Sequence, residues 1–280
     1  MATFPSYDGT VLAYHEKGDG PPLVCVPGGP ARASEYLGDL GGLSAHRRLV
    51  LLDNRGTGDS AVPADPATYR SDRLVDDVEA LRAALGLETF DLLGHSASGA
   101  VALRYAARFP HRLRRLVLVA PGLAEVGLAA TDDEQGAVIG SRAGEPWFPE
   151  ALAALRTWLG GEDSPALTLA RSPFFYGRWD ERAAAHVASG ERQRNPEAAE
   201  LFSAEGAHTP AETVPALAKV EAPVLVLAGA LDPSPVVRIA GEAADLFPNG
   251  RLVVLPGGGH FPWLDDEAAF VRAVEDFLAE

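Results

Sequence analysis

Short apolar runs alternate with helical patterns along most of the chain. Runs of strand length occupy residues 23–26, 49–52, 90–93, 116–120, 224–229 and 252–255, and a loop containing glycine, proline or aspartate follows each. Such continuous runs are typical of strands that are covered on both faces. Helical spacing occurs at residues 71–87, 236–246 and 267–278. The alternation predicts an α/β fold, with a mostly parallel, twisted sheet flanked by helices.

The alternation stops after residue 122. Residues 123–214 lack buried-type strands and carry alanine-rich helical stretches that glycine and proline interrupt. We therefore expect a core formed by residues 1–122 and 215–280, with residues 123–214 inserted as a helical cap. Three consecutive aromatic residues of the cap, Phe174, Phe175 and Tyr176, are candidates for the roof of a substrate pocket. The alternative is that these aromatic residues form the small core of the cap itself.

Two weaker patterns lie near the N-terminus. Residues 10–16 alternate weakly and predict a hairpin strand, and residues 34–43 predict a short helix. A glycine-punctuated loop, Asp53-Asn54-Arg55-Gly56-Thr57-Gly58-Asp59-Ser60, follows the run at 49–52. We expect Arg55 and Asp59 to brace this loop rather than to react.

Composition excludes several classes of partner. The chain has 280 residues, 47% of them hydrophobic, and a net charge of −15, which disfavours binding to nucleic acid or to anionic membranes. Its single cysteine, Cys25, excludes an internal disulfide and fits a reducing compartment. The first residues lack a basic segment followed by a long apolar run. We therefore expect a cytoplasmic protein. The motifs described below, rather than composition, predict that it acts on a small molecule or a short peptide.

Ser96 stands where the run at 90–93 changes abruptly into a helical pattern. Where a strand and a helix are joined by so short a turn, the residues around Ser96 must be small. These residues are Gly94, Ala97, Ser98 and Gly99. This arrangement resembles the nucleophile elbow Gly-x-Ser-x-Gly, with Ser98 in place of the second glycine. The pattern predicts Ser96 as a nucleophile, and the alternative is a plain Gly/Ser-rich turn.

A serine nucleophile needs a base, and the base needs an acid to orient it. His260 follows the last apolar run in a glycine-rich loop, and Asp232 follows the run before it. Since the carboxyl ends of parallel strands share one edge of the sheet, we predict that Ser96, Asp232 and His260 form a catalytic triad. The backbone N–H groups of Gly29 and Ala97 are candidates for an oxyanion hole. We see no metal-ligand spacing and no phosphate-binding glycine loop, and expect no cofactor.

Two motifs carry a resemblance to a known family. Gly28-Gly29-Pro30 and the loop at 53–60 are similar to those of the proline iminopeptidase (prolyl aminopeptidase) group of α/β-hydrolases. Pro27, Ala31 and Ser98 stand where the group has histidine, glycine and glycine. The resemblance implies an α/β-hydrolase fold with a cap. It also implies that cap acids, here loosely Glu191 and Glu205, bind the free amine of the substrate.

The sequence thus predicts a serine hydrolase of small amides or esters, with an iminopeptidase-like aminopeptidase as the preferred activity. An esterase, lactonase or thioesterase acting on a hydrophobic small molecule is the first alternative. A ligand receptor that retains the hydrolase fold without catalysis is an alternative of another class. Enzymes with an aspartate nucleophile are disfavoured, because Ser96 holds the elbow position.

Overall fold

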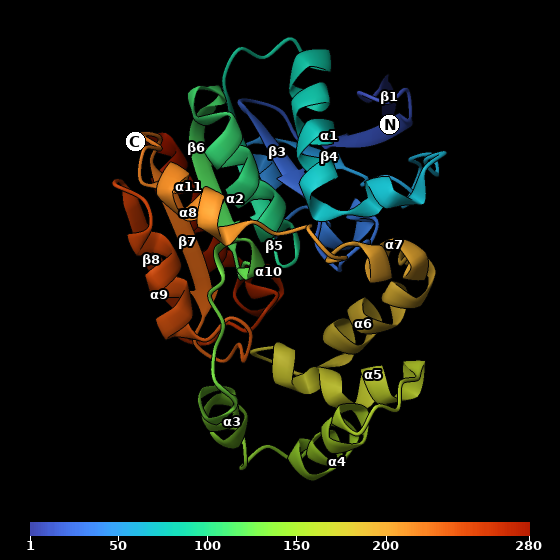
Figure 1. Cartoon of the computed structure of the whole chain (residues 1–280). Helices are drawn as coiled ribbons and strands as arrows, with labels where there is room; N and C mark the ends of the chain where they lie inside the picture. Colours follow the sequence, from blue (N-terminus) through green and yellow to red (C-terminus); the bar gives the residue numbers. More distant parts are fainter.

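A single eight-stranded sheet runs through the computed structural model, which describes residues 1–280 (Figure 1). The strands are β1 (Ala2–Pro5), β2 (Val11–Lys17), β3 (Pro22–Val26), β4 (Arg48–Leu52), β5 (Phe90–His95), β6 (Leu113–Val119), β7 (Val224–Gly229) and β8 (Gly250–Leu255). Their spatial order is β1-β2-β4-β3-β5-β6-β7-β8. The β1–β2 and β2–β4 pairs are antiparallel and all the others are parallel. The predicted α/β fold is confirmed.

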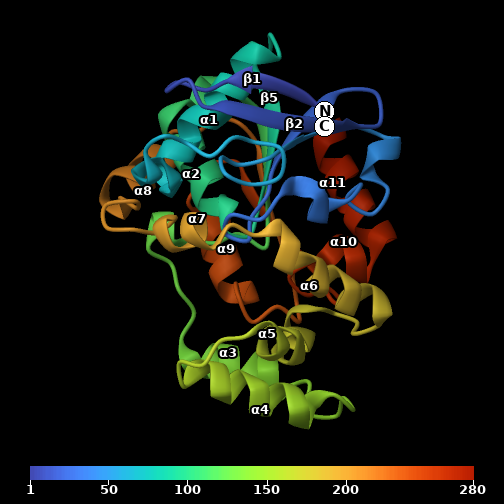
Figure 2. The ribbon, with the colours of Figure 1, turned by 90° about the vertical axis from the view of Figure 1, so that its right-hand side faces the viewer.

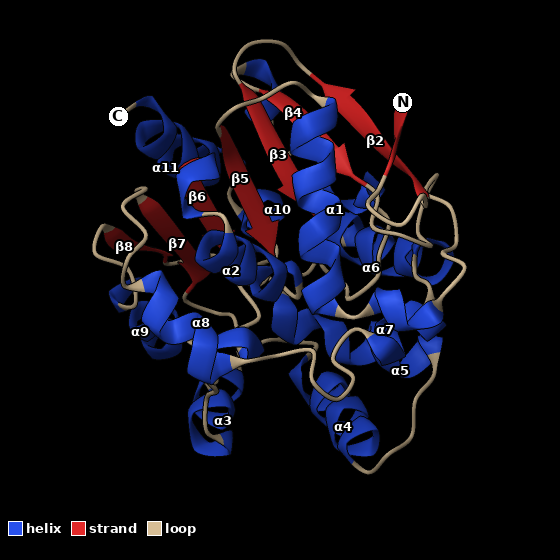
Figure 3. Ribbon diagram, turned by 45° about the horizontal axis from the view of Figure 1, so that its top comes forward, coloured by secondary structure: helices blue, strands red, loops and turns tan.

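Helices cover both faces of this sheet (Figure 3). One face packs against α1 (Ser71–Ala84), α2 (Ser98–Arg108) and α9 (Val237–Asp245), and the other packs against α11 (Glu267–Ala279), which follows the short α10 (Pro262–Asp265). Strand residues alternate between the two resulting cores. In β3, Val24 belongs to the first core and Cys25 to the second. Both faces are therefore apolar, which explains the uninterrupted hydrophobic runs in the sequence.

The chain between β6 and β7 contains helices and no strand. These helices are α3 (Asp132–Gly140), α4 (Phe148–Leu159), α5 (Pro165–Arg171), α6 (Glu181–Gln193), α7 (Pro196–Leu201) and α8 (Pro210–Leu217). Figures 1 and 2 show α3, α4 and α5 together at one end of the molecule, beyond the sheet. The last helix, α8, instead packs against α2 in the layer beside the sheet. The expected boundary at residue 214 thus falls inside a helix that lies on the core.

One local expectation differs from the structure, and one observed strand was not expected. Residues 34–43 form no α-helix but two short 3₁₀ turns, Ser34–Leu37 and Leu43–Ala45. Three consecutive residues between the turns, Leu40 to Gly42, have positive φ angles, which a right-handed helix cannot accommodate. No pattern in the sequence indicates β1, a four-residue edge strand that pairs with β2.

None of the helices combines the length and the apolar character that a crossing of a lipid bilayer needs.

Arg55 braces the glycine-punctuated loop from inside. Its side chain is fully buried, and its Nε donates to Asp77 Oδ2 on α1 at 2.8 Å. A second nitrogen donates to Asp8 at 2.7 Å, so one guanidinium joins the N-terminal segment, the loop and the helix. Asp59 contributes through its backbone N–H, which donates to Asp53 at 3.0 Å. These bonds hold the loop against the carboxyl edge of the sheet.

Candidate active site

Ser96 lies at a sharp turn between β5 and α2, and its φ angle is +52°. The turn depends on glycine at positions where other backbone comes too close for a side chain. A Cβ at Gly94 would lie 2.9 Å from the Ala102 side chain, and one at Gly99 would lie 2.6 Å from Pro121. A non-glycine residue with positive φ is strained, and such strain is concentrated at functional sites. The turn exposes the Ser96 hydroxyl at the end of the sheet.

The three predicted catalytic residues meet in one hydrogen-bonded chain. His260 Nε2 lies 2.8 Å from Ser96 Oγ, and His260 Nδ1 lies 2.8 Å from Asp232 Oδ2. Asp232 is buried, and its other oxygen accepts the backbone N–H of Ser234 at 2.9 Å. Burial, the largest single influence, lowers the pKa of His260, but the charge of Asp232 and the hydrogen bonds to Asp232 and Ser234 together outweigh it and raise this pKa above its ordinary value.

The backbone N–H groups of Gly29 and Ala97 donate to no other group of the chain. Ala97 directly follows Ser96 at the start of α2, where the helix dipole favours negative charge. Gly29 belongs to the loop after β3, which packs on the elbow so closely that a Cβ at Gly28 would lie 2.5 Å from the His95 carbonyl oxygen. Both groups are thus free to donate to an oxygen atom held beside Ser96.

Ser98 joins the elbow to this same loop. Its side chain is fully buried, and its hydroxyl donates to the carbonyl of Pro27. The Asn54 amide donates to the same carbonyl at 3.1 Å. The residue that replaces the usual glycine of the elbow therefore makes a bond that glycine cannot make.

A second chain of hydrogen bonds links the elbow to both neighbouring loops. His95 Nε2 lies 2.9 Å from the carbonyl oxygen of His260, so this nitrogen carries the proton and donates. His95 Nδ1 then accepts from the Tyr36 hydroxyl at 2.6 Å, and the Tyr36 oxygen accepts the Gly28 N–H at 2.7 Å. Burial, and next the charge of His260, lower the pKa of His95 well below its ordinary value. A neutral imidazole thus connects three loops, a role that no sequence signal indicated.

A cavity of about 800 Å³ opens above Ser96 and His260. Residues of α5, α6 and the turn between them supply most of its lining, so the predicted cap covers the candidate active site. Phe175, Tyr176 and Glu191 line the cavity, as the sequence suggested. Three arginines that the sequence analysis did not single out, Arg32, Arg171 and Arg194, also line it.

Two predicted pocket residues lie elsewhere. Phe174 is buried against Trp147 and Phe148, with ring centroids 5.3 and 5.7 Å away, so it belongs to the small core of the cap. Phe175, the next residue, lines the cavity because the short 3₁₀ turn at Ser172–Phe175 directs the two side chains to different sides. Glu205 is exposed and does not line the cavity, so it cannot bind the amine of a substrate there.

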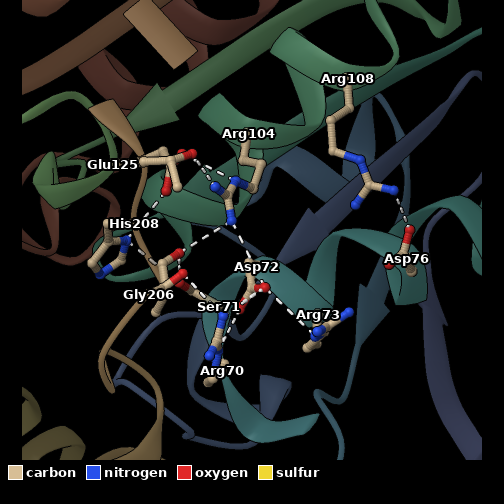
Figure 4. Close-up of polar contacts among 12 residues, drawn as sticks. Arg70, Ser71, Asp72, Arg73, Asp76, Arg104, Arg108, Glu125, Gly206 and His208 are labelled. Carbon is tan, nitrogen blue, oxygen red and sulfur yellow. Dashed lines mark hydrogen bonds and ion pairs between the residues drawn. The ribbon is translucent and has the colours of Figure 1, made fainter. Parts of the chain in front are cut away.

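A polar cluster on the core explains the position of Glu205 (Figure 4). Arg70 donates to the backbone carbonyls of Glu205 and Gly206 at 3.0 and 2.9 Å, which holds this segment against the start of α1. Buried Glu125 pairs with Arg104 on α2 at 3.1 Å and meets His208 at 3.2 Å. The cluster fastens the returning chain to the core, away from the cavity.

One group of residues has the composition of a metal site. Ligand atoms of His15, Asp53 and Asp59 lie within 4.8 Å of one another. Both oxygens of Asp53 are already engaged, since Oδ1 accepts the Ser34 N–H at 2.8 Å and Oδ2 meets His15 Nε2 at 2.9 Å. The group therefore fastens β2, β4 and the following loop to one another without needing an ion.

The comparisons with known proteins agree with this fold. A family model described as the alpha/beta hydrolase fold matches residues 21–267. N-formylmaleamate deformylase from Pseudomonas putida is 29% identical over 93% of this chain and 90% of its own length. A proline iminopeptidase from Heyndrickxia coagulans is 32% identical, over 39% of this chain and 38% of its own length.

Solved structures add the same result at the level of the fold. A putative aryl esterase from Burkholderia cenocepacia has a TM-score of 0.76 at 24% identity, with 99% of this chain and 97% of the esterase covered. At that identity the likeness concerns the fold alone. Because the family model spans most of the chain, this protein belongs to the α/β-hydrolase fold family.

Proposed function

We propose that this protein is a serine hydrolase that cleaves a small amide or ester through an acyl-enzyme on Ser96. The observation that carries the proposal is the continuous chain of hydrogen bonds from Asp232 through His260 to Ser96, beside a cavity. A hydroxyl within 2.8 Å of an imidazole that a buried carboxylate orients is the arrangement that activates serine. A pure receptor would have no need of this arrangement.

Each step follows from the positions of these groups. Ser96 Oγ attacks the carbonyl carbon while its proton passes to His260 Nε2, and Asp232 stabilises the resulting imidazolium. The N–H groups of Gly29 and Ala97 donate to the negative oxygen of the tetrahedral intermediate. The intermediate collapses, and the leaving group departs with the proton of His260. Water then gives a proton to His260 and attacks the acyl group, and Ser96 regains a proton as the acid is released.

The cavity favours the esterase or amidase activity over the aminopeptidase. Of the two acids expected to bind a free amine, only Glu191 lines the cavity, and it is exposed. Three arginines that line the same cavity would repel a protonated amine. A relative that aligns over 93% of the chain is named as a deformylase, whereas the iminopeptidase aligns over 39% of it. The aminopeptidase activity stays a prediction from sequence.

We predict that Ser96→Ala lowers hydrolysis of 4-nitrophenyl butyrate by roughly 10⁴-fold or more and abolishes labelling by a fluorophosphonate probe. The fold should remain, because alanine only removes the hydroxyl. Ser141→Ala is the matched control, since it removes an exposed hydroxyl of the cap that does not line the cavity and should keep the label. Labelling of the Ser96→Ala protein, or no labelling of the wild type, would contradict the proposal and favour a receptor.

We predict that a blocked amine is tolerated. Alanyl and prolyl naphthylamides, their N-acetyl forms and 4-nitrophenyl butyrate would be compared by kcat/KM. Because the cavity offers no buried acid to an amine, N-acetylation should not slow cleavage, and the ester should be cleaved fastest. A large loss of activity on N-acetylation would instead support the aminopeptidase.

The rate of fluorophosphonate labelling should fall at acid pH. His260 accepts a proton only when it is neutral, so labelling declines as the pH drops through the raised pKa of this imidazole. Asp232→Asn removes the charge that raises this pKa and leaves the burial that lowers it. We predict that the acid limb of the pH profile then moves to lower pH, with a rate that is roughly 10³- to 10⁴-fold lower. An acid limb that does not move would exclude this pairing.

Tyr36→Phe should slow catalysis without removing any catalytic group. The change takes the acceptor from the Gly28 N–H and the donor from His95, which loosens the loop that carries Gly29. We predict a fall in kcat of roughly ten- to a hundredfold, with a smaller change in KM. The control is Tyr105→Phe, which removes a buried hydroxyl bonded to Glu79 and should lower the melting temperature only. Equal kcat for Tyr36→Phe and the wild type would refute this positioning role.

A further inference from the structure

Most arginines of this chain form ion pairs with carboxylates, but a few do not. Sixteen of the 22 arginines form an ion pair with a carboxylate. Of the six that do not, three line the cavity beside Ser96, namely Arg32, Arg171 and Arg194. Arg32 is also buried, with 3% of its surface exposed. Buried charges are normally paired, so this cavity departs from the rule that the rest of the molecule follows.

The backbone holds two of these arginines against each other. Arg32 and Arg194 are partners in an isolated antiparallel β-bridge between the loop after β3 and the end of α6. A Cβ at Gly190 would lie 3.7 Å from Arg194 Nε and 3.8 Å from Arg32 Cζ, so both guanidinium groups approach one point. Like charges on directly opposed residues destabilise a pair of strands. The fold thus brings together two cations that repel each other.

The hydrogen bonds leave donors free in this cluster. Arg32 donates only to neutral acceptors, with Nε bonded to the Gln193 amide oxygen and one terminal nitrogen to the His186 carbonyl and Ser189. Its other terminal nitrogen has no partner in the chain, and the Arg194 side chain donates to nothing. Burial lowers the pKa of Arg32 to about 10, which still leaves the group protonated at neutral pH.

Arg171 adds a third positive charge. Its Nε is buried without a partner, and its guanidinium lies 4.3 Å from the centre of the Trp158 ring. The acids of the cavity lining, Asp163 and Glu191, are exposed, and neither forms an ion pair with any of the three arginines. The net charge of the chain is −15, so only a local concentration of positive charge can attract an anion here.

We propose that Arg32 and Arg194, with Arg171 beside them, bind a carboxylate carried by the substrate. The inference rests on the proposed function and names its substrate class: a small ester or amide that bears a carboxylate near the scissile carbonyl. A carboxylate supplies the charge that the cluster lacks and accepts two N–H groups from one guanidinium at once. Arg32 lies beside the loop that carries Gly29, and its guanidinium is 4.5 Å from the centre of the Tyr36 ring, so the bound carboxylate lies close to the reacting group.

Matched esters test the substrate class. One pair is mono-4-nitrophenyl glutarate and its methyl ester, which differ by the charge on the acyl part. The other is 4-carboxyphenyl butyrate and its methyl ester, which differ by the charge on the leaving group. We expect at least one charged ester to exceed its neutral partner in kcat/KM by roughly tenfold or more. Equal or lower values for both charged esters would overturn the inference.

Variants test whether Arg32 and Arg194 cause the preference for the charged ester. Arg194→Gln removes an exposed side chain without hydrogen bonds and should fold, and it should reduce the charged-to-neutral ratio of kcat/KM by roughly ten- to a hundredfold. Arg32→Gln should reduce it at least as much. The control, Arg192→Gln, changes an exposed arginine of α6 that pairs with Glu35 outside the cavity, and it should leave the ratio unchanged. An unchanged ratio in Arg194→Gln and Arg32→Gln would overturn the inference.

A binding measurement separates this inference from the proposed mechanism. In the Ser96→Ala protein, glutarate should raise the melting temperature, and Arg194→Gln should remove the effect. Inorganic phosphate and glutaramide serve as the other probes and should stabilise less. If glutarate has no effect while the wild type still labels with fluorophosphonate, the carboxylate site is wrong and the serine hydrolase stands. If glutarate binds but no labelling occurs, the carboxylate site is supported and the proposed mechanism fails.

Discussion

The site depends on the close packing of the Pro27–Gly29 loop against the elbow. Gly28 approaches the His95 carbonyl so closely that no side chain fits between them. Gly29 follows β3 and Ser96 follows β5, and this contact brings the two residues together at the cavity. The N–H of Gly29 has no other acceptor in the chain. Ser98 and Tyr36 then hold the loop from two sides by hydrogen bonds. A water-filled gap at this place would separate the Gly29 N–H from the elbow.

The sequence predicted best the residues whose positions follow from the ends of strands. Ser96, Asp232 and His260 each follow a strand of the parallel part of the sheet, and parallel order alone brings such residues to one edge. It predicted less well what depends on packing within the cap. Phe174 and Phe175 are adjacent in the sequence, yet one fills the core of the cap and the other lines the cavity. Within a 3₁₀ turn of four residues, apolar periodicity cannot distinguish a residue of the cap core from a residue that lines the cavity.

The arginine cluster was invisible in the sequence for a different reason. Arg32 and Arg194 are separated by most of the chain, and only the β-bridge between the core and the cap brings them together. In a chain with 39 acidic residues, each arginine is expected to find a carboxylate. Which arginine lacks one depends on the tertiary neighbours and not on local composition. For the same reason the sequence could not show that Glu191 shares its cavity with three arginines.

A backbone hydrogen bond connects the cap to the loop that carries His260. The backbone N–H of His260 donates to the Phe175 carbonyl at 2.8 Å, and Phe175 itself lines the cavity. Gly259 cannot carry a side chain there, because a Cβ would lie 2.6 Å from the same carbonyl oxygen. A displacement of the turn that carries Phe175 therefore moves the loop that carries His260. Since the proposed general-base step requires a short distance between His260 and Ser96, the segment that lines the cavity also sets the position of His260.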